Sequence, residues 1–345
     1  MLRRLSIYTL LGLGIGVFVP TAAEAAPVVV RGSGDITAAV TAFRAALGNP
    51  ANGATPGEQP SGRREINWDA VPADVTNTNT FPAAFFNTTS TRGAVFSPAN
   101  GFRVSDVNFA DINPTYEAQF NTFSAPKSFM VVGSNTFDVE FQVAGETTPA
   151  AVNGFGVVFS DVDRRGSARL EFFQGPISLG VFSAPRRSDA NGLSFVGVTF
   201  SEGERVTRVR VTSGDAPLAA GRNDVSAGGN QDLVVMDDFL YGEPRADSDR
   251  DGVLDEDDER PNSDTRAKVD VNGEAVGQTS LDNRVRSDGF TIQDLIEDVA
   301  NNSQNRRQFI RRLQRLVNEL RKDRLITRAE GSALVRAGQR RSFNL

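Results

Sequence analysis

The chain has 345 residues, a formal net charge of −6, and neither cysteine nor histidine. The lack of both residue types excludes Ser-His-Asp and Cys-His catalytic pairs, disulfides, and the ordinary zinc, haem, copper and iron–sulfur sites. Hydrophobic residues make up 39% of the chain and charged residues 23%, which is typical of a globular protein rather than a disordered one. Stability must therefore come from an apolar core, from a metal ion bound by oxygen atoms, or from both.

Residues 1–25 have the pattern of a secretory signal peptide. Two arginines precede an apolar run at residues 10–19, and the tripeptide Ala-Glu-Ala that ends at Ala25 matches a cleavage site. The run is short for a membrane-spanning helix. We therefore expect cleavage near Ala25, no membrane span in the mature chain, and a secreted, periplasmic or cell-surface location. The alternative is an uncleaved N-terminal anchor.

Residues 26–62 are predicted to hold a short helix and a flexible linker. Apolar residues recur at helical spacing from Ile36 to Leu47, and Gly48 follows as a stop signal. Residues 49–62 are rich in proline and glycine and have no apolar periodicity. This composition favours a linker.

From residue 63 to residue 244 the apolar period becomes two, which is the period of a β-strand. The strand candidates are residues 65–69, 93–97, 102–105, 137–143, 155–159, 168–174, 179–183, 194–200, 208–211 and 233–241. Closely spaced strands with no helical pattern between them predict a mainly β domain, an antiparallel β-sandwich of the jelly-roll type. The many phenylalanines are expected in the core between its two sheets.

The strongest chemical signal is an acidic segment at residues 245–265. Counted from Asp247 as position 1, carboxylates occupy positions 1, 3, 5, 9 and 12, and a glycine occupies position 6, where a sharp turn is needed. The predicted calcium ligands are Asp247, Asp249, Asp251, the backbone carbonyl of Val253, Asp255 and Asp258. An oxygen-rich, flexible cage of this kind favours Ca²⁺ over Mg²⁺. The alternative is a solvated acidic linker.

The run DSDRDGVLDEDDERP, residues 247–261, resembles a thrombospondin type-3 repeat, a calcium-binding unit common in bacterial surface proteins. The Asn-Cys that usually precedes the proline of that repeat is Glu259-Arg260 here, so the disulfide-linked form is absent. Residues 61–69 and 234–244 resemble the first and last strands of an uncharacterised secreted bacterial β-sandwich protein. The resemblance implies calcium binding and a location at the cell surface.

Residues 266–345 are predicted to form a helical basic tail. Thr291 and Thr327 each open a capping box, and residues 288–296 resemble a helical segment that often follows type-3 repeats. Residues 306–341 contain twelve Lys or Arg and three Asp or Glu. Three roles compete for these charges: a solvated helix face, a site for an anionic polymer, and attraction to the acidic loop. No nucleic-acid motif is present, and we expect no nucleic-acid partner.

Carboxylates in or beside the predicted strands form a second candidate metal site. Its residues are Asp69, Asp161, Asp163, Asp237 and Asp238. Strict alternation places Asp237 and Asp238 on opposite faces of a strand that is apolar on both faces, so at least one carboxylate must be paired or metal-bound. Pairing with arginine is favoured over calcium, and calcium over an acid pair for glycoside hydrolysis. The candidate arginines are Arg63, Arg64, Arg208 and Arg210.

The sequence therefore predicts an exported β-sandwich protein with Ca²⁺ as its cofactor and a role in binding, adhesion or surface structure. The expected partner is a glycan or another anionic surface polymer. The alternative is a metal-assisted or two-carboxylate polysaccharide hydrolase. Few side chains could stack on a sugar ring. Apart from its phenylalanines, the mature chain has only three aromatic residues, Trp68, Tyr116 and Tyr241. The sequence indicates neither the identity of the ligand nor an oligomeric state.

Overall fold

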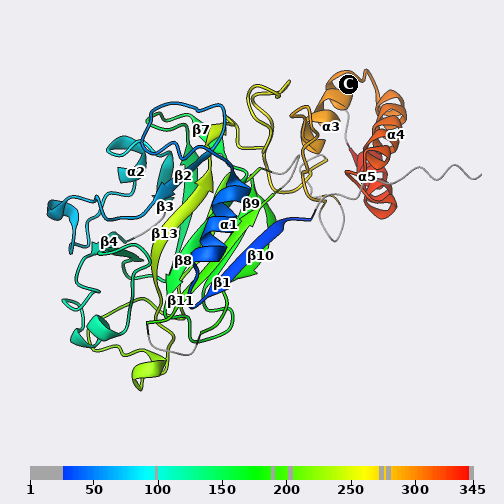
Figure 1. The fold of residues 1–345 in the computed structure, drawn as a ribbon. Helices are drawn as coiled ribbons and strands as arrows, with labels where there is room; N and C mark the ends of the chain where they lie inside the picture. The colour runs from blue at the N-terminus through cyan, green and yellow to red at the C-terminus, as the bar shows by residue number, and fades with distance from the viewer. Residues whose placement is uncertain are drawn as a thin grey trace, which may run out of the picture.

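The computed structural model describes residues 26–97, 100–187, 191–200, 205–271, 276 and 281–341. The predicted signal peptide, residues 1–25, lies outside them. The described chain is mainly antiparallel β, with two seven-stranded sheets and a small C-terminal helical region (Figure 1). Each helix among these residues is too short or too polar to cross a bilayer.

The first sheet has the strand order β1-β11-β8-β13-β5-β4, and β2 also pairs with β13. Its strands are β1 (Val28–Ser33), β2 (Arg63–Ile66), β4 (Phe102–Ser105), β5 (Ser128–Val131), β8 (Gly154–Ser160), β11 (Leu193–Thr199) and β13 (Val235–Gly242). Strands β1 and β5 are not among the predicted strands. Strand β1 begins in a run of three valines with no polar alternation, and it pairs antiparallel with β11 along its whole length. Strand β5 likewise holds three consecutive apolar residues with no polar alternation.

The second sheet has the order β10-β9-β12-β6-β7-β14, and β3 also pairs with β6. Its strands are β3 (Ala94–Ser97), β6 (Thr136–Gln142), β7 (Pro149–Ala151), β9 (Arg169–Gln174), β10 (Ile177–Ser183), β12 (Arg208–Thr212) and β14 (Arg245–Ala246). Strands β7 and β14 are too short to show a period of two, and the sequence did not predict them. Short helices lie in the connections at α2 (Phe85–Thr88), Ala73–Val75, Pro114–Ala118 and Val225–Ala227.

Aromatic side chains fill the space between the two sheets, as the composition predicts. Phe129 and Phe239 of the first sheet lie in one buried cluster with Phe96 and Phe137 of the second. Trp68 is 1% exposed and stacks on Phe129 with ring centroids 4.0 Å apart. Because its ring belongs to the core, Trp68 does not offer a surface on which a sugar could stack.

The predicted N-terminal helix is α1 (Thr37–Leu47), which packs on the outer face of the first sheet (Figure 1). Phe43, on its buried side, is fully enclosed. Gly156 of β8 and Gly197 of β11 face each other across the strand pair. A Cβ atom at Gly197 would lie 2.7 Å from ring atoms of Phe43. The glycine pair therefore makes the recess that receives this ring.

Residues 49–62, the predicted flexible linker, contain no helix or named strand but are hydrogen-bonded to the sheets. The buried guanidinium of Arg64 donates to the backbone carbonyls of Thr55 and Gly57 at 2.7 and 3.1 Å. The same group pairs with buried Glu243 at 2.6 Å. A buried charge needs such partners, so this segment is anchored against β2 and β13.

Strand β13 contains a β-bulge at Asp237 and Asp238. Its pairing with β8 passes from Met236 opposite Phe159 to Phe239 opposite Val157, which leaves one extra residue on β13. Strict alternation would put Met236 and Phe239 on opposite faces, but both lie in the core between the sheets. The predicted assignment of residues 233–241 to two faces is therefore wrong after the bulge, because one inserted residue reverses the alternation.

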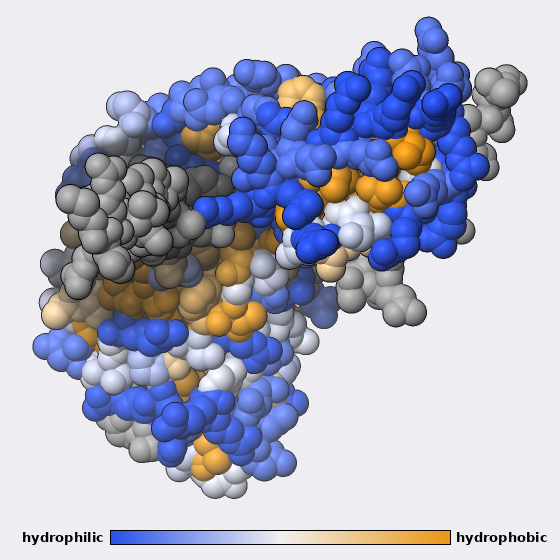
Figure 2. Space-filling view, turned by 90° about the vertical axis from the view of Figure 1, so that its right-hand side faces the viewer, coloured by the Kyte–Doolittle hydropathy of each residue, from blue (hydrophilic) through white to orange (hydrophobic). Residues whose placement is uncertain are grey.

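The C-terminal helices have a hydrophobic cluster of their own, to which Val269 and Leu281 also belong. The helices are α3 (Ile292–Asn301), α4 (Arg306–Lys322) and α5 (Arg328–Arg340). Both predicted capping boxes are present, at Thr291 and at Thr327. Figure 2 shows that hydrophilic side chains cover most of the side of the molecule on which these helices lie.

The recess under α1 yields a test of the packing. Gly197→Ala should destabilise the protein by about 1–3 kcal/mol, because the new methyl group overlaps a fully buried ring. Thermal unfolding followed by circular dichroism measures the effect. Val181→Ala, at a side chain that is 53% exposed on β10, is the control and should unfold like the wild type. An unchanged melting temperature for Gly197→Ala would contradict the packing of Phe43 against this glycine.

Candidate metal centre

The acidic loop, residues 247–258, follows β14 and connects the second sheet to the C-terminal helices. On the sheet side, Arg250 pairs with Glu140 of β6 at 2.9 Å. On the helix side, the backbone N–H of Ser263 donates to Asp249 Oδ2 at 2.7 Å. The loop is thus held from both sides while its own carboxylates turn toward one another.

Three of the predicted ligands converge. Asp247, Asp249 and Asp251 each offer one carboxylate oxygen, and these oxygens all lie within 4.8 Å of one another. Asp247 is fully buried and Asp251 is 5% exposed. Gly252 has a φ of 96°, and its N–H donates to Asp247 Oδ2 at 3.1 Å. A glycine at this position lets the chain turn sharply around the convergent oxygens.

Three carboxylate oxygens of the loop are buried without a hydrogen-bond partner: Asp247 Oδ1, Asp251 Oδ2 and Asp258 Oδ2. In each residue the other oxygen accepts a backbone N–H, as Asp251 Oδ1 does from Val253 at 2.7 Å. A buried carboxylate oxygen with no donor costs free energy. Positions 1, 5 and 12, where these oxygens occur, are among those that ligate calcium in a twelve-residue loop.

The electrostatics of the loop oppose the ionised state of its acids. Burial and the neighbouring Asp249 carboxylate raise the pKa of Asp247 to about 7. Burial, with the Asp249 charge as a further cause, raises the pKa of Asp251 to about 8. Burial also raises the pKa of Asp249 and of Asp258. A divalent cation among these groups would offset the repulsion that raises their pKa values.

Asp255, the predicted ligand at position 9, lies outside the convergent group. Its two oxygens accept from the backbone N–H and the hydroxyl of Ser248, both at 2.7 Å, and the residue is exposed. Val253, the predicted carbonyl ligand, donates its N–H to Asp251 within the same turn. The structure thus gathers Asp247, Asp249 and Asp251. Asp258 lies outside this convergent group, and Asp255 is bonded to Ser248.

The five residues of the second predicted site divide between two places. Asp161 and Asp163, just after β8, gather with Asp224, and one carboxylate oxygen of each lies within 4.8 Å of the others. Asp161 is fully buried, and Asp163 and Asp224 are 8% and 1% exposed. Sequence reasoning missed Asp224, because it follows a stretch with no strand pattern. Its only local signal is its position as the N-cap of the helical turn Val225–Ala227.

This cluster also contains buried carboxylate oxygens without a hydrogen-bond partner, which we call orphaned oxygens; they are Asp161 Oδ1 and Asp163 Oδ2. The other Asp161 oxygen accepts from the Gln119 side-chain amide, and Asp224 accepts from the N–H groups of Ser226 and Leu233. Burial and the charges of the neighbouring aspartates raise the pKa of Asp161 to about 8 and that of Asp163 to about 6. These acids resemble those of the loop in burial and in the convergence of their oxygens.

Asp237 and Asp238 lie apart from that cluster, at the β-bulge. The Ser124 hydroxyl donates to Asp238 at 2.7 Å and approaches Asp237 at 3.3 Å, so both carboxylates reach the same side chain. Asp237 also accepts the N–H groups of Phe123 and Ser124. Asp69 accepts the N–H of Lys127 from the same connection. Protein donors therefore hydrogen-bond to these three acids.

The arginines proposed as partners of Asp237 and Asp238 pair elsewhere. Their acids are Glu65 for Arg63, Glu243 for Arg64, and Asp138 for Arg208 and Arg210. The arginine near the bulge is instead Arg44 of α1, at 3.7 Å from Asp238. The sequence could not indicate this pairing, because it depends on how α1 docks on the sheet.

Comparisons of this chain with protein-family models, with curated proteins and with solved structures find no match. The two acidic clusters are therefore the features of the molecule from which a function can be inferred.

The orphaned oxygens of the loop predict opposite effects of one substitution with and without calcium. Asp251→Asn keeps the acceptor for Val253 and removes one buried charge. In excess chelator the variant should unfold at the same temperature as the wild type or a higher one. At calcium 100-fold above the dissociation constant, the wild type should gain about 2.7 kcal/mol and the variant much less.

Thermal unfolding in chelator and in calcium measures both effects, and Asp257→Asn is the matched control. Asp257 is an exposed acid of the same loop, so its variant should respond to calcium as the wild type does. Equal calcium stabilisation of Asp251→Asn and wild type would contradict the site.

Proposed function

We propose that the protein is an exported calcium-binding protein with a role in binding, adhesion or cell-surface structure. The observation that carries this proposal is the set of three buried carboxylate oxygens without donors, at positions 1, 5 and 12 of one loop. A hard cation with oxygen ligands is the natural partner of such a set. Asp247, Asp249 and Asp251 would hold it, because their carboxylate oxygens converge.

Calcium at this loop would act as a structural link. Arg250 of the loop is paired with the second sheet, and Asp249 is hydrogen-bonded to the segment that leads to the helices. A cation that orders the loop would therefore fix the helical region relative to the sheets. Weak sites of this kind, with dissociation constants of about 10⁻⁴–10⁻³ M, suit extracellular calcium levels.

We further propose that the two sheets form a β-sandwich of the jelly-roll type. Supporting this assignment are the wholly antiparallel pairing of the named strands and the one aromatic core that the sheets share. Export is supported by the composition of residues 1–25.

An anionic surface polymer, such as an acidic glycan, is the proposed partner. Exposed arginines on α4 support it; they are Arg306, Arg307, Arg311, Arg315 and Arg321. Just after the acidic loop, Arg260 pairs with Asp294 and Asp298 of α3, so these ion pairs place the basic residue on the loop side and the acids on the helix. The basic face of α4 is accordingly directed to solvent rather than to the acidic loop.

Isothermal titration calorimetry tests the loop as a calcium site. The double variant Asp249→Asn/Asp251→Asn should lose the heat that the wild type gives in the range of about 10⁻⁴–10⁻³ M calcium. Asp257→Asn should retain it. Equal calcium heats from the wild type and the double variant would overturn the assignment of this loop.

A further inference from the structure

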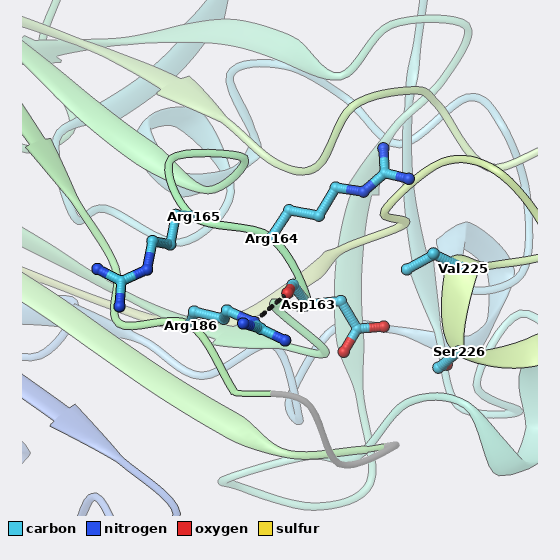
Figure 3. Close-up of a pocket in the computed structure, with 6 residues that line it drawn as sticks. All are labelled: Asp163, Arg164, Arg165, Arg186, Val225 and Ser226. Atoms are coloured by element: carbon cyan, nitrogen blue, oxygen red, sulfur yellow. Dashed lines mark hydrogen bonds between the residues drawn. The ribbon is translucent and has the colours of Figure 1, made fainter.

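A pocket of about 440 Å³ opens beside the second acidic cluster (Figure 3). Its lining residues are Asp163, Arg164, Arg165, Arg186, Val225 and Ser226. A neighbouring hollow of about 660 Å³ shares Arg165 and Arg186 with it and adds Arg31. The two hollows thus form a continuous basic surface with one acidic residue at its wall.

The lining residues have distinct orientations. In Figure 3 the Asp163 carboxylate points toward Val225 and Ser226, and the Arg186 guanidinium lies beside it. Arg186 Nε donates to the Asp163 backbone carbonyl at 2.7 Å. The hydroxyl and N–H of Ser226 donate to Asp224. Asp163 therefore belongs both to the acidic cluster and to the wall of the pocket.

The arginines of the pocket differ in whether they already form an ion pair with a carboxylate. Arg164 is paired with Asp215 at 2.6 Å. Arg165 and Arg186 are exposed, and within the described residues neither forms an ion pair with a carboxylate. Two guanidinium groups are thus free to bind an anion that enters the pocket.

The cluster beside the pocket has the features of a cation site. One oxygen from each of Asp161, Asp163 and Asp224 lies within 4.8 Å of the others. Fully buried Asp161 has one oxygen with no donor, and Asp163 has another. Three carboxylates and no nitrogen or sulfur ligand favour a hard divalent cation such as calcium. The competing occupant is a proton shared among the acids.

We propose that Asp161, Asp163 and Asp224 bind a second calcium ion at the wall of this pocket, and that this ion acts with Arg165 and Arg186 to bind carboxylate groups of an acidic polysaccharide. A calcium ion bound by few protein ligands accepts further oxygen atoms. Arginine binds carboxylates through two parallel hydrogen bonds. The adjacent hollow, with Arg31, receives the next acidic sugar of the chain.

The polysaccharide part of this inference rests on the proposed function, whereas the second cation does not. Repeated acidic sugars match two adjoining hollows that share their arginines. Carboxylate is favoured over sulfate because calcium binds carboxylate oxygens readily. A preference for a sulfated polymer would overturn the choice of uronic acids.

Calcium stoichiometry tests the second cation without any sugar. Asp161→Asn suits this test, because asparagine tolerates the left-handed φ of 71° at this position and can still accept from Gln119. Titration of the chain from residue 26 onward should give two calcium ions for the wild type and one each for Asp161→Asn and Asp251→Asn. Unfolding in chelator shows that each variant folds.

The stoichiometries separate the failure of either site. Two ions in Asp161→Asn would mean that its cluster does not bind calcium, which overturns the inference. One ion in the wild type that is lost in Asp161→Asn but kept in Asp251→Asn would instead overturn the proposed loop site. Asp163→Asn should repeat the result of Asp161→Asn.

Binding of oligogalacturonate in calcium, measured by calorimetry, tests the pocket. Arg186→Gln should keep both calcium ions. It should raise the dissociation constant of the oligosaccharide at least about tenfold, because charge-assisted hydrogen bonds are lost. Asp161→Asn should raise this constant as well. Arg340→Gln, at an exposed arginine of α5, is the matched control and should bind normally. Neutral dextran should not bind.

Unchanged binding by Arg186→Gln, or no binding of oligogalacturonate by the wild type, would overturn the polysaccharide part. Tighter binding of dextran sulfate than of oligogalacturonate would reassign the pocket to sulfated polymers.

Discussion

The cost of burying carboxylates away from water and from basic groups is the constraint on which this structure depends. Asp161 and Asp247 are fully buried, and each has an oxygen without a donor. Elsewhere the chain compensates its buried acids within the protein, as Arg64 does for Glu243. Among the described residues, the two orphaned clusters have no ion pair of this kind, so uptake of protons or of a cation would offset the cost of their burial. If the proposed calcium sites are occupied, calcium binding and the order of these segments are coupled.

This coupling gives the loop a mechanical role. Residues 247–258 are tied to β6 through Arg250 and to the helical segment through Asp249. The helices have their own hydrophobic cluster and do not share the aromatic core of the sheets. In the proposed function, an ordered loop would fix the position of the helical region, and of the exposed arginines of α4, relative to the sheets.

Sequence reasoning succeeded where the signal is local and failed where it depends on the fold. The ligand spacing of the acidic loop and most strands are visible in contiguous residues. The bulge on β13 is not visible in the sequence. It exists only in the pairing of β13 with β8, where one extra residue on β13 reverses the faces of the residues that follow. Asp224 is likewise invisible, since the connection that carries it folds back on Asp161 from a distant part of the chain. Strand β1 lacks alternation and forms by pairing with β11.

The most direct test of a cation at the orphaned oxygens is a crystal structure of the mature protein grown in calcium, with anomalous data collected at long wavelength. We predict an anomalous peak within about 2.3–2.6 Å of oxygens of Asp247, Asp249 and Asp251, the distance of calcium–oxygen bonds. A site that holds only water, or a basic side chain among these oxygens, would contradict it.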